Sequence, residues 1–324
     1  MEKNKNKFSG GKRFSALEIQ LFRRYRLCRS RSINTRKNHY VILRDIAEIL
    51  TKQFNLQNLK NLKEKHIEFI IHEWKKRGYK KSTLATKIGF LRKFCIAIGK
   101  KSCIKDNRSY SVKKGKVLFT DKRWTTSSDQ ALEIINKVNV QVHKYGDKIC
   151  DVLKLEVLFG LRKREALRFW AASEIVADPI TGKPFRIELT IGTKNNRYRT
   201  IPVVTQRQEI FLRELLDKYK FDTIQPFPPN EYKKWERIYY YILDKIGING
   251  LRTGHGLRQT YANDRLKAIL EETRRYSDVN NFHESDEKIR MVAYQKLTQE
   301  LGHGRIDILK SYLADFCYPN KKKK

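Results

Sequence analysis

Six residues spread along the chain carry side chains that together could cleave a phosphodiester bond. The set comprises two arginines, a lysine, two histidines and a tyrosine: Arg162, Lys194, His255, Arg258, His303 and Tyr312. Charge builds on the phosphate oxygens in the transition state, and arginines from two separate segments could bind these oxygens because a guanidinium keeps its charge and its planar donor geometry. Lysine or histidine could protonate the leaving oxygen. A tyrosine hydroxyl, with an ordinary pKa of about 10, could attack only beside cations or a base.

Taken singly, each of these residues has a plainer explanation. Arg162 and Glu165 lie one helical turn apart, as exposed ion pairs often do, although Glu165 could also hold a neighbouring cationic or imidazole side chain. Lys194 is expected in a solvated turn, and Tyr312 follows an apolar pattern typical of a core position. His303 stands between two glycines, where backbone can approach a ligand closely, but a lone histidine there is more often structural. The complete set, in this order, favours the chemical interpretation.

The charge of the chain indicates a polyanionic partner. Its 324 residues include 70 Lys and Arg against 35 Asp and Glu, a formal net charge of +35. A field of that sign attracts nucleic acid, which we favour over the alternative of a merely solvated basic surface. The hydrophobic fraction of 40% is sufficient for packed cores, and the length indicates about two domains.

Cysteine usage and hydropathy limit the compartment. The five cysteines are scattered and form no CxxC pair: Cys28, Cys95, Cys103, Cys150 and Cys317. This pattern predicts neither a zinc site nor a disulfide framework and fits a reducing compartment. No apolar run approaches the roughly 20 residues of a membrane span, and the basic N-terminus lacks the apolar core of a secretion signal. We therefore expect a cytoplasmic, nucleoid-associated protein without a membrane partner.

The first third of the chain predicts a basic helical module. Residues 1–32 are polar and rich in arginine, so we expect a basic N-terminal arm or a disordered tail. Residues 33–104 carry apolar side chains at helical spacing with lysines on the opposite faces, which predicts a small DNA-binding bundle. Residues 105–128 lose this periodicity and predict a basic linker that crosses a phosphate backbone. The lysines expected to contact DNA are Lys80, Lys81, Lys87, Lys113, Lys114 and Lys116.

Residues 129–324 predict a second, mixed domain. Helical patterns are expected at 129–139, 146–158, 162–169, 212–219, 235–246, from 256 onward, and at 291–301. Between them, residues 185–191 alternate apolar and polar side chains as a half-buried strand does, and residues 198–204 return as a second strand in which Pro202 marks a sheet edge. Lys194 is then expected at the tip of this hairpin. The charged stretch 271–288 is expected to be an inserted subunit contact or a disordered loop.

Three segments resemble the sequence boxes of the tyrosine recombinases, the phage-integrase family of site-specific recombinases. The boxes are Leu158–Leu167, His255–Ala262, and Leu301–His303 followed nine residues later by Tyr312. The resemblance covers about 129–316, while the preceding helical bundle matches the family's core-binding domain in character only. It implies a mainly α-helical fold with a small antiparallel hairpin, in which a helical core-binding domain precedes a mixed α/β catalytic domain.

The resemblance also implies how the phosphate is held. Arg162 and Arg258 would grip the scissile phosphate, and His303 would form a hydrogen bond with it. Glu165 matches the acidic residue that supports such a site. Arginines that act together in this way stabilise the charge that develops in the transition state.

The remaining residues would carry out the strand cleavage. Tyr312 would attack to give a 3′-phosphotyrosyl link, Lys194 would protonate the leaving 5′ oxygen, and His255 would act in proton transfer. A 5′ hydroxyl of a second strand would reverse the attack. Because the covalent link keeps the energy of the phosphodiester bond, no ATP, metal or other cofactor is implied. The expected function is integration or excision of a mobile element by a homotetramer on two sites in double-stranded DNA, with accessory DNA-bending proteins left open.

The sequence departs from the family pattern in several places. The interval between Arg258 and His303 is longer than we expect, and Gln259 stands where relatives often have histidine. The tail after Tyr312 is short, which leaves the contact between subunits open, and Tyr318 is a rival nucleophile. Two other functions also remain as alternatives: a topoisomerase IB-like or telomere-resolving enzyme, and a DNA-binding regulator that has lost catalysis.

Overall fold

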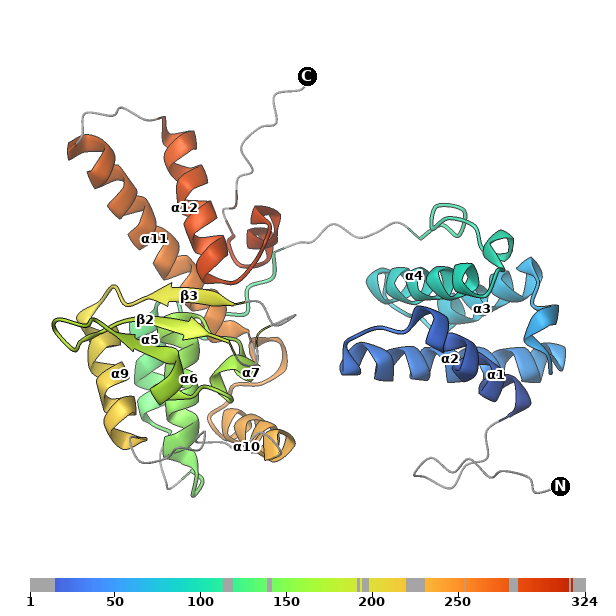
Figure 1. Ribbon diagram of the computed structural model, residues 1–324, viewed down its shortest axis with the longest axis horizontal. Coiled ribbons are helices and arrows are strands. Elements are labelled where there is room, and N and C mark those ends of the chain that lie inside the picture. Colours follow the sequence, from blue (N-terminus) through green and yellow to red (C-terminus); the bar gives the residue numbers. More distant parts are fainter. Residues whose placement is uncertain are drawn as a thin grey trace. The chain divides into compact units, whose positions relative to one another are not determined.

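The chain forms two compact units, which are described separately (Figure 1). The computed structural model describes residues 15–112, 119–138, 142–190, 193, 198–219, 231–253, 255–279, 285–314 and 316. One unit lies within Met1–Lys116 and the other within Val117–Lys324. The predicted fold class is confirmed, since helices dominate both units and one small antiparallel sheet lies in the second.

The first unit is a bundle of four helices. They are α1 (Ala16–Tyr25), α2 (Ile33–Phe54), α3 (Glu64–Lys76) and α4 (Lys81–Ala97), and a 3-10 turn, Arg26–Cys28, follows α1. The expected N-terminal arm is wrong for residues 16–28. Leu17, Leu21 and Tyr25 recur every four residues as one apolar stripe of α1 and are buried in the core of the bundle. The cluster of arginines around this stripe concealed it in the sequence.

The expected linker is also shorter than predicted. Ile104, Tyr110 and Val112 are buried in the core of the bundle, and the Tyr110 hydroxyl accepts a hydrogen bond from the backbone N–H of Lys105. Trp124, at the other end, is buried in the core of the second unit. Most of the predicted linker therefore belongs to one unit or the other, and residues 113–118, with Lys113, Lys114 and Lys116, lie outside the described residues.

A partly buried aspartate joins three helices of the bundle. Asp45 of α2 accepts hydrogen bonds from the Trp74 indole of α3 at 2.7 Å, from Arg77 at 2.6 Å and from Lys87 of α4 at 3.1 Å. The Lys87 ammonium also lies 4.7 Å from the centre of the Trp74 ring. Burial raises the pKa of Asp45, but hydrogen bonds from Arg77, Lys87 and Trp74 outweigh it, so the pKa lies below its ordinary value.

The second unit surrounds a central helix. Its helices are α5 (Ser128–Asn136), α6 (Gly146–Phe159), α7 (Lys163–Ala166), α8 (Ala171–Glu174), α9 (Gln206–Lys218), α10 (Tyr232–Lys245), α11 (Gly256–Val279) and α12 (Asp286–Glu300). A helix that is apolar on all sides belongs inside a fold, and α6 is buried along most of its length. It contacts α5, α7, α9, α10 and α11. Helix α6 therefore ends, at Phe159, in the middle of the unit.

The sheet has three antiparallel strands in the order β1 (Ile175–Ala177), β2 (Pro184–Leu189) and β3 (Arg199–Pro202). Leu189 pairs with Arg199 and Arg186 with Pro202. The two predicted strands are confirmed, with β3 at the edge as Pro202 indicated. Strand β1 was not predicted, because three residues with an irregular register are too few to show alternation. Helix α9 packs against β2, and α12 packs against β3.

Within the charged stretch 271–288, the described residues are helical apart from Ser285. Residues 271–279 extend α11 and residues 286–288 begin α12, and the two helices lie side by side (Figure 1). Glu, Arg and Lys are good helix formers, so a polar sequence can prolong a helix whose inner side stays buried, as at Ile269 and Thr273. The alternative of a disordered loop is wrong for these described residues.

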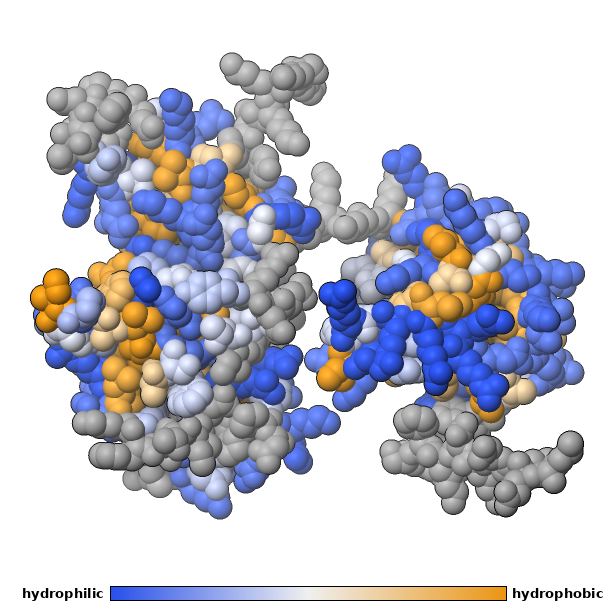
Figure 2. Space-filling model, in the orientation of Figure 1, coloured by the Kyte–Doolittle hydropathy of each residue, from blue (hydrophilic) through white to orange (hydrophobic). Residues whose placement is uncertain are grey.

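Hydrophilic side chains cover most of the visible face of both units, with smaller apolar patches among them (Figure 2). Within the described part of the chain, no helix combines the length and the apolar character that a membrane span requires.

Replacing Asp45 with alanine should destabilise the bundle by about 2 to 4 kcal/mol, because Trp74 and Lys87 would lose their partner. The carboxylate has a lowered pKa when folded, so its contribution is present above the ordinary aspartate pKa of 3.8 and is lost as the pH falls through the lowered value. Urea unfolding of the full chain, followed by hydrogen exchange in α2 to α4, measures both effects.

The matched control is Glu48→Ala, which removes an exposed pair with Lys52 one helical turn away. Exposed pairs of this kind contribute about 0.3 to 0.5 kcal/mol. Equal effects of the two variants would contradict the structural role of Asp45.

Candidate active site

Arg162 is positioned by a sharp turn at the end of α6. Gly160 has a left-handed backbone (φ +60°), and a Cβ atom there would lie 2.3 Å from the Tyr261 ring, so only glycine fits. The chain then enters α7, where the Arg162 guanidinium meets the carboxylate of Glu165 at 2.6 Å and the Arg162 backbone N–H meets its other oxygen at 2.8 Å. The side chain of Glu165 is fully buried. The predicted pair of Arg162 and Glu165 is thus an ion pair in the interior of the protein and not one on its surface.

A third arginine, Arg199 of β3, also binds Glu165. The sequence did not predict this residue as part of the site. Arg199 donates to Glu165 at 2.5 Å and to the backbone carbonyl of Glu300 at 2.5 Å, and it is 4% exposed. Gly302 (φ +61°) leaves room for it, since a Cβ atom there would lie 2.7 Å from Arg199 Cδ. One signal was present in the sequence: Arg199 is in phase with the buried Ile201 along the strand and therefore faces inward.

Arg258 brings the three sequence boxes together. It lies in the first turn of α11 with no exposed surface. Its guanidinium donates to the carbonyl of Gly160, to the carbonyl of Leu301 at 2.5 Å and to the Tyr312 hydroxyl at 3.2 Å. Three residues that are far apart in the sequence therefore all form hydrogen bonds with the Arg258 side chain.

Tyr312 follows a 3-10 segment, Ile306–Ser311, and is 8% exposed. Its hydroxyl lies 3.2 Å from His303 Nε2, which is itself 3.5 Å from Arg258 Nη2. Burial raises the pKa of Tyr312, but the charge and hydrogen bond of Arg258, with the charges of Arg162 and Arg199, outweigh it. The pKa of the hydroxyl therefore lies below its ordinary value, so the hydroxyl ionises to the phenolate more easily.

The cluster of arginines carries an excess of positive charge. Arg162, Arg199 and Arg258 surround the one carboxylate of Glu165. Burial raises the pKa of Glu165, but these arginines lower it further than burial raises it, so the group stays ionised. Three guanidinium groups and one carboxylate leave an excess of about two charges, which suits a bound anion.

His255 immediately precedes α11, one turn before Arg258. Burial, together with the charges of Arg258, Lys122 and Arg162, lowers its pKa to about 4. The residue nevertheless retains an exposed surface. With this pKa, the His255 imidazole is neutral at pH 7. Because part of the residue is exposed, it can exchange a proton with a donor or acceptor outside the protein core.

The other predicted site residues are not part of this cluster as described. Lys194 and Tyr318 lie outside the described residues. In the first unit, Lys80 and Lys81 are exposed at the start of α4. Lys87 instead binds Asp45 within the bundle. Among the described residues, no three His, Cys, Asp or Glu side chains gather closely enough to hold a metal ion.

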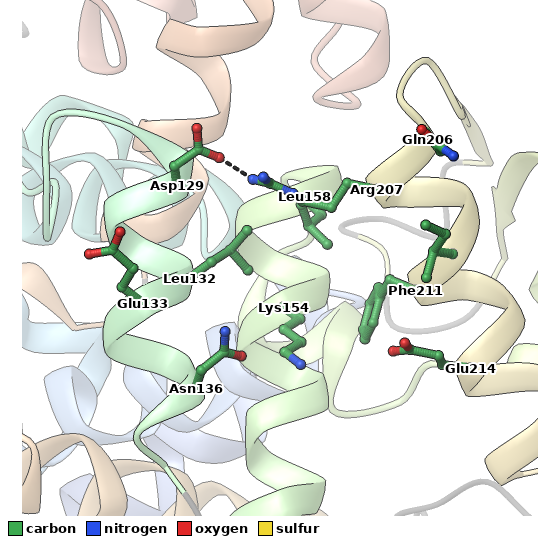
Figure 3. Close-up of a pocket in the computed structure, with 11 residues that line it drawn as sticks. Asp129, Leu132, Glu133, Asn136, Lys154, Leu158, Gln206, Arg207, Phe211 and Glu214 are labelled. Atoms are coloured by element: carbon green, nitrogen blue, oxygen red, sulfur yellow. Dashed lines mark hydrogen bonds and ion pairs between the residues drawn. The ribbon is translucent and has the colours of Figure 1, made fainter.

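A pocket of about 590 Å³ between α5, α6 and α9 is separate from the cluster (Figure 3). Its walls include Leu132, Leu158 and Phe211, and an ion pair between Asp129 and Arg207 crosses it. None of the arginines of the cluster lines it. The candidate active site is therefore identified by the arrangement of the arginines around Tyr312, and not by the size of a cavity.

Two family descriptions match the chain in its two units. "Phage integrase, N-terminal" matches residues 16–104, and "Integrase" matches residues 118–264. The first match begins at Ala16, where α1 begins, in agreement with the corrected boundary. A search of curated proteins finds no match.

Solved structures of DNA complexes share the fold. A lambda integrase dimer bound to a COC′ core site has a TM-score of 0.58 at 16% identity, over 95% of this chain and 80% of that one. The XerH site-specific recombinase bound to palindromic difH substrate has a TM-score of 0.55 at 17% identity, over 92% and 82%. The Tn1549 transposon integrase in complex with a circular intermediate DNA has a TM-score of 0.53 at 14% identity, over 92% and 95%. With the family matches and the convergence of Arg162, Arg258, His303 and Tyr312, the chain belongs to the tyrosine recombinases.

Proposed function

We propose that this protein is a site-specific recombinase that cleaves and rejoins DNA strands through a 3′-phosphotyrosyl intermediate, to integrate or excise a mobile element. The observation that carries the proposal is the Tyr312 hydroxyl, which lies at 3.2 Å from both Arg258 and His303 in a cluster of cationic side chains. This arrangement supports the proposal, because a nucleophile, its activating cation and a phosphate-binding group would then be assembled before DNA arrives.

Arg162 and Arg258 would bind the non-bridging oxygens of the scissile phosphate, with His303 as a further hydrogen-bond donor. The side chain of Arg162 is 16% exposed, so it is not completely enclosed by the protein. Because these donors are held by protein contacts, they need little reorganisation as charge develops on the phosphate.

The chemical step would exchange one phosphoester for another. The Tyr312 oxygen attacks phosphorus while the bond to the 5′ oxygen breaks. Neutral His255 accepts the phenolic proton, and Lys194 delivers a proton to the leaving 5′ oxygen. Rejoining is the reverse: a 5′ hydroxyl attacks the phosphotyrosine and restores the phenol, so no external energy source is consumed.

We propose double-stranded DNA as the partner and a homotetramer on two sites as the working assembly. The net charge of +35 supports the first. A lambda integrase tetramer bound to a Holliday junction, with a TM-score of 0.53 and 17% identity, supports the second. The Tn1549 transposon integrase supports a role in the movement of a genetic element, and we place this activity with the DNA of the cytoplasm.

Tyr312→Phe should abolish covalent attachment to DNA and leave DNA affinity nearly unchanged, since only the attacking oxygen is removed. A substrate nicked near the cleavage site traps the adduct, which denaturing gels detect. The control is Tyr318→Phe, which removes the rival hydroxyl and should keep the adduct. Persistence of the adduct in Tyr312→Phe would refute the assignment of the nucleophile.

Attack should occur within one protomer, because Tyr312 already contacts Arg258 of its own chain. We therefore expect that mixing Arg162→Ala with Tyr312→Phe restores no adduct, although each mixed assembly contains an intact arginine and an intact tyrosine. Adduct levels above those of Arg162→Ala alone would show instead that the tyrosine is donated to a neighbouring protomer.

Arg199→Lys should slow adduct formation about tenfold or more with DNA affinity changed by less than about threefold. Lysine keeps the charge but lacks the planar fork that reaches both Glu165 and the Glu300 carbonyl. Arg186→Lys, on the neighbouring strand, is the control and should leave the rate unchanged because Arg186 is half exposed and pairs with Glu188. A wild-type rate in Arg199→Lys would exclude a positioning role.

A further inference from the structure

We propose that Gln259 is a positioning residue through which the segment Phe119–Trp124 holds the backbone of the nucleophile. This segment follows residues 113–118, which join the two units in sequence. The inference rests on the proposed function, because it assigns to Gln259 an effect on attack by Tyr312.

The Gln259 carboxamide connects two distant parts of the chain. It is 2% exposed. Its oxygen accepts from the Lys122 backbone N–H at 2.7 Å, and its nitrogen donates to the carbonyls of Thr120 at 3.1 Å and Ser311 at 3.2 Å. Since one neighbour is a donor and two are acceptors, only one orientation of the amide satisfies all three contacts. Ser311 immediately precedes Tyr312.

Asn263, one turn further along α11, supports the same backbone. Its side-chain nitrogen donates to the Tyr312 carbonyl at 2.9 Å and to the Gln259 carbonyl at 2.7 Å. Two successive carbonyls, those of Ser311 and Tyr312, are therefore anchored to α11. Arg258, which binds the Tyr312 hydroxyl, lies on that helix too. The position of the nucleophile relative to Arg258 thus depends on the contacts of Gln259 and Asn263.

The segment Phe119–Trp124 packs tightly against the start of α11. A Cβ atom at Gly256 would lie 2.5 Å from the Lys122 carbonyl and 2.6 Å from Trp124 Cδ1, so the glycine permits the contact. The Trp124 indole also donates to the Arg252 carbonyl at 3.1 Å. A displacement of Thr120 or Lys122 would remove contacts from the same amide that holds Ser311.

The chemistry of the side chain explains why glutamine suits this place. A neutral histidine, for comparison, offers one donor and one acceptor. It could not serve Lys122, Thr120 and Ser311 together. Glutamine at this position therefore makes a three-way contact that histidine could not make.

The test compares Gln259→Met with Gln208→Met in the full-length protein. Gln208 of α9 is a matched control: it is 5% exposed, donates to the Leu158 carbonyl and accepts from the backbone N–H groups of Val204 and Thr205. Both variants lose a buried amide of similar contacts, so both should be similarly destabilised. Only Gln259→Met should slow single-turnover adduct formation, by about ten- to a hundredfold, with DNA affinity within about threefold.

A substrate with sulfur in place of the leaving 5′ oxygen separates attack from proton donation. A thiolate leaves without a proton donor, so this substrate should restore cleavage to Lys194→Ala. It should not restore cleavage to Gln259→Met, whose defect lies in the nucleophile. Restoration of Gln259→Met, or equal slowing by Gln208→Met, would overturn the inference.

Hydrogen exchange supplies a readout that does not depend on cleavage. In Gln259→Met, the amides of residues 119–124 and those of 309–313 should both exchange faster, while in Gln208→Met neither segment should change. Faster exchange in only one segment would show that Gln259 does not connect them. If the wild-type protein formed no adduct at Tyr312, the proposed function would fail, and the exchange data would still decide whether the connection exists.

Discussion

The buried guanidinium of Arg258 makes the contacts on which the candidate active site depends. Its charge would be costly in the interior without partners, and the partners it has come from three separate parts of the chain: the Gly160 carbonyl after α6, the Leu301 carbonyl after α12 and the Tyr312 hydroxyl. Satisfying this one side chain therefore fixes where both helices end and where the tyrosine lies. Glycine at 160 follows from the same constraint, because the turn must pass close to the Tyr261 ring to present its carbonyl.

Charge balance explains the second layer of the site. Arg162 and Arg199 lie near Arg258 and repel it, and Glu165 between them compensates part of this repulsion. The carboxylate cannot neutralise three guanidinium groups, so the site keeps an excess of positive charge, which lowers the pKa of Tyr312. On the proposed function, the same excess charge would account for both the binding of phosphate and the activation of Tyr312 as the nucleophile.

The parts of the site that could be predicted from sequence are those defined by short intervals. Arg162 with Glu165, and His255 with Arg258, lie one turn apart, and local geometry alone places such pairs together. Arg199 could not be predicted in this way, since its partners lie 34 and 101 residues away. Gln259 reaches across 137 residues to Lys122. In the bundle, helix α1 was missed because its narrow apolar stripe is surrounded by arginines, and Lys87 was assigned to an exposed face although Asp45 holds it inside. Long-range pairing, and not local propensity, determined the contacts of Arg199, Gln259 and Lys87.

Arg162 and Arg258 already form hydrogen bonds within the protein, so binding a phosphate would require further N–H donors on these side chains. A count of their N–H groups gives the number that remain. A guanidinium has five N–H groups. Within the described part of the chain, Arg258 has four hydrogen-bonding partners: Gly160, Leu301, Tyr312 and His303. Arg162 has two, Glu165 and Leu301. About four N–H groups therefore remain: three on Arg162, whose side chain is 16% exposed, and one on Arg258, which has no exposed surface. For the proposed phosphate contact, Arg162 supplies most of the free donors, and Arg258 would need a small movement to expose its own. On the proposed function, DNA would enter a site whose guanidinium groups are already held by protein contacts, so the cost of arranging these cations would be met during folding and not during the reaction.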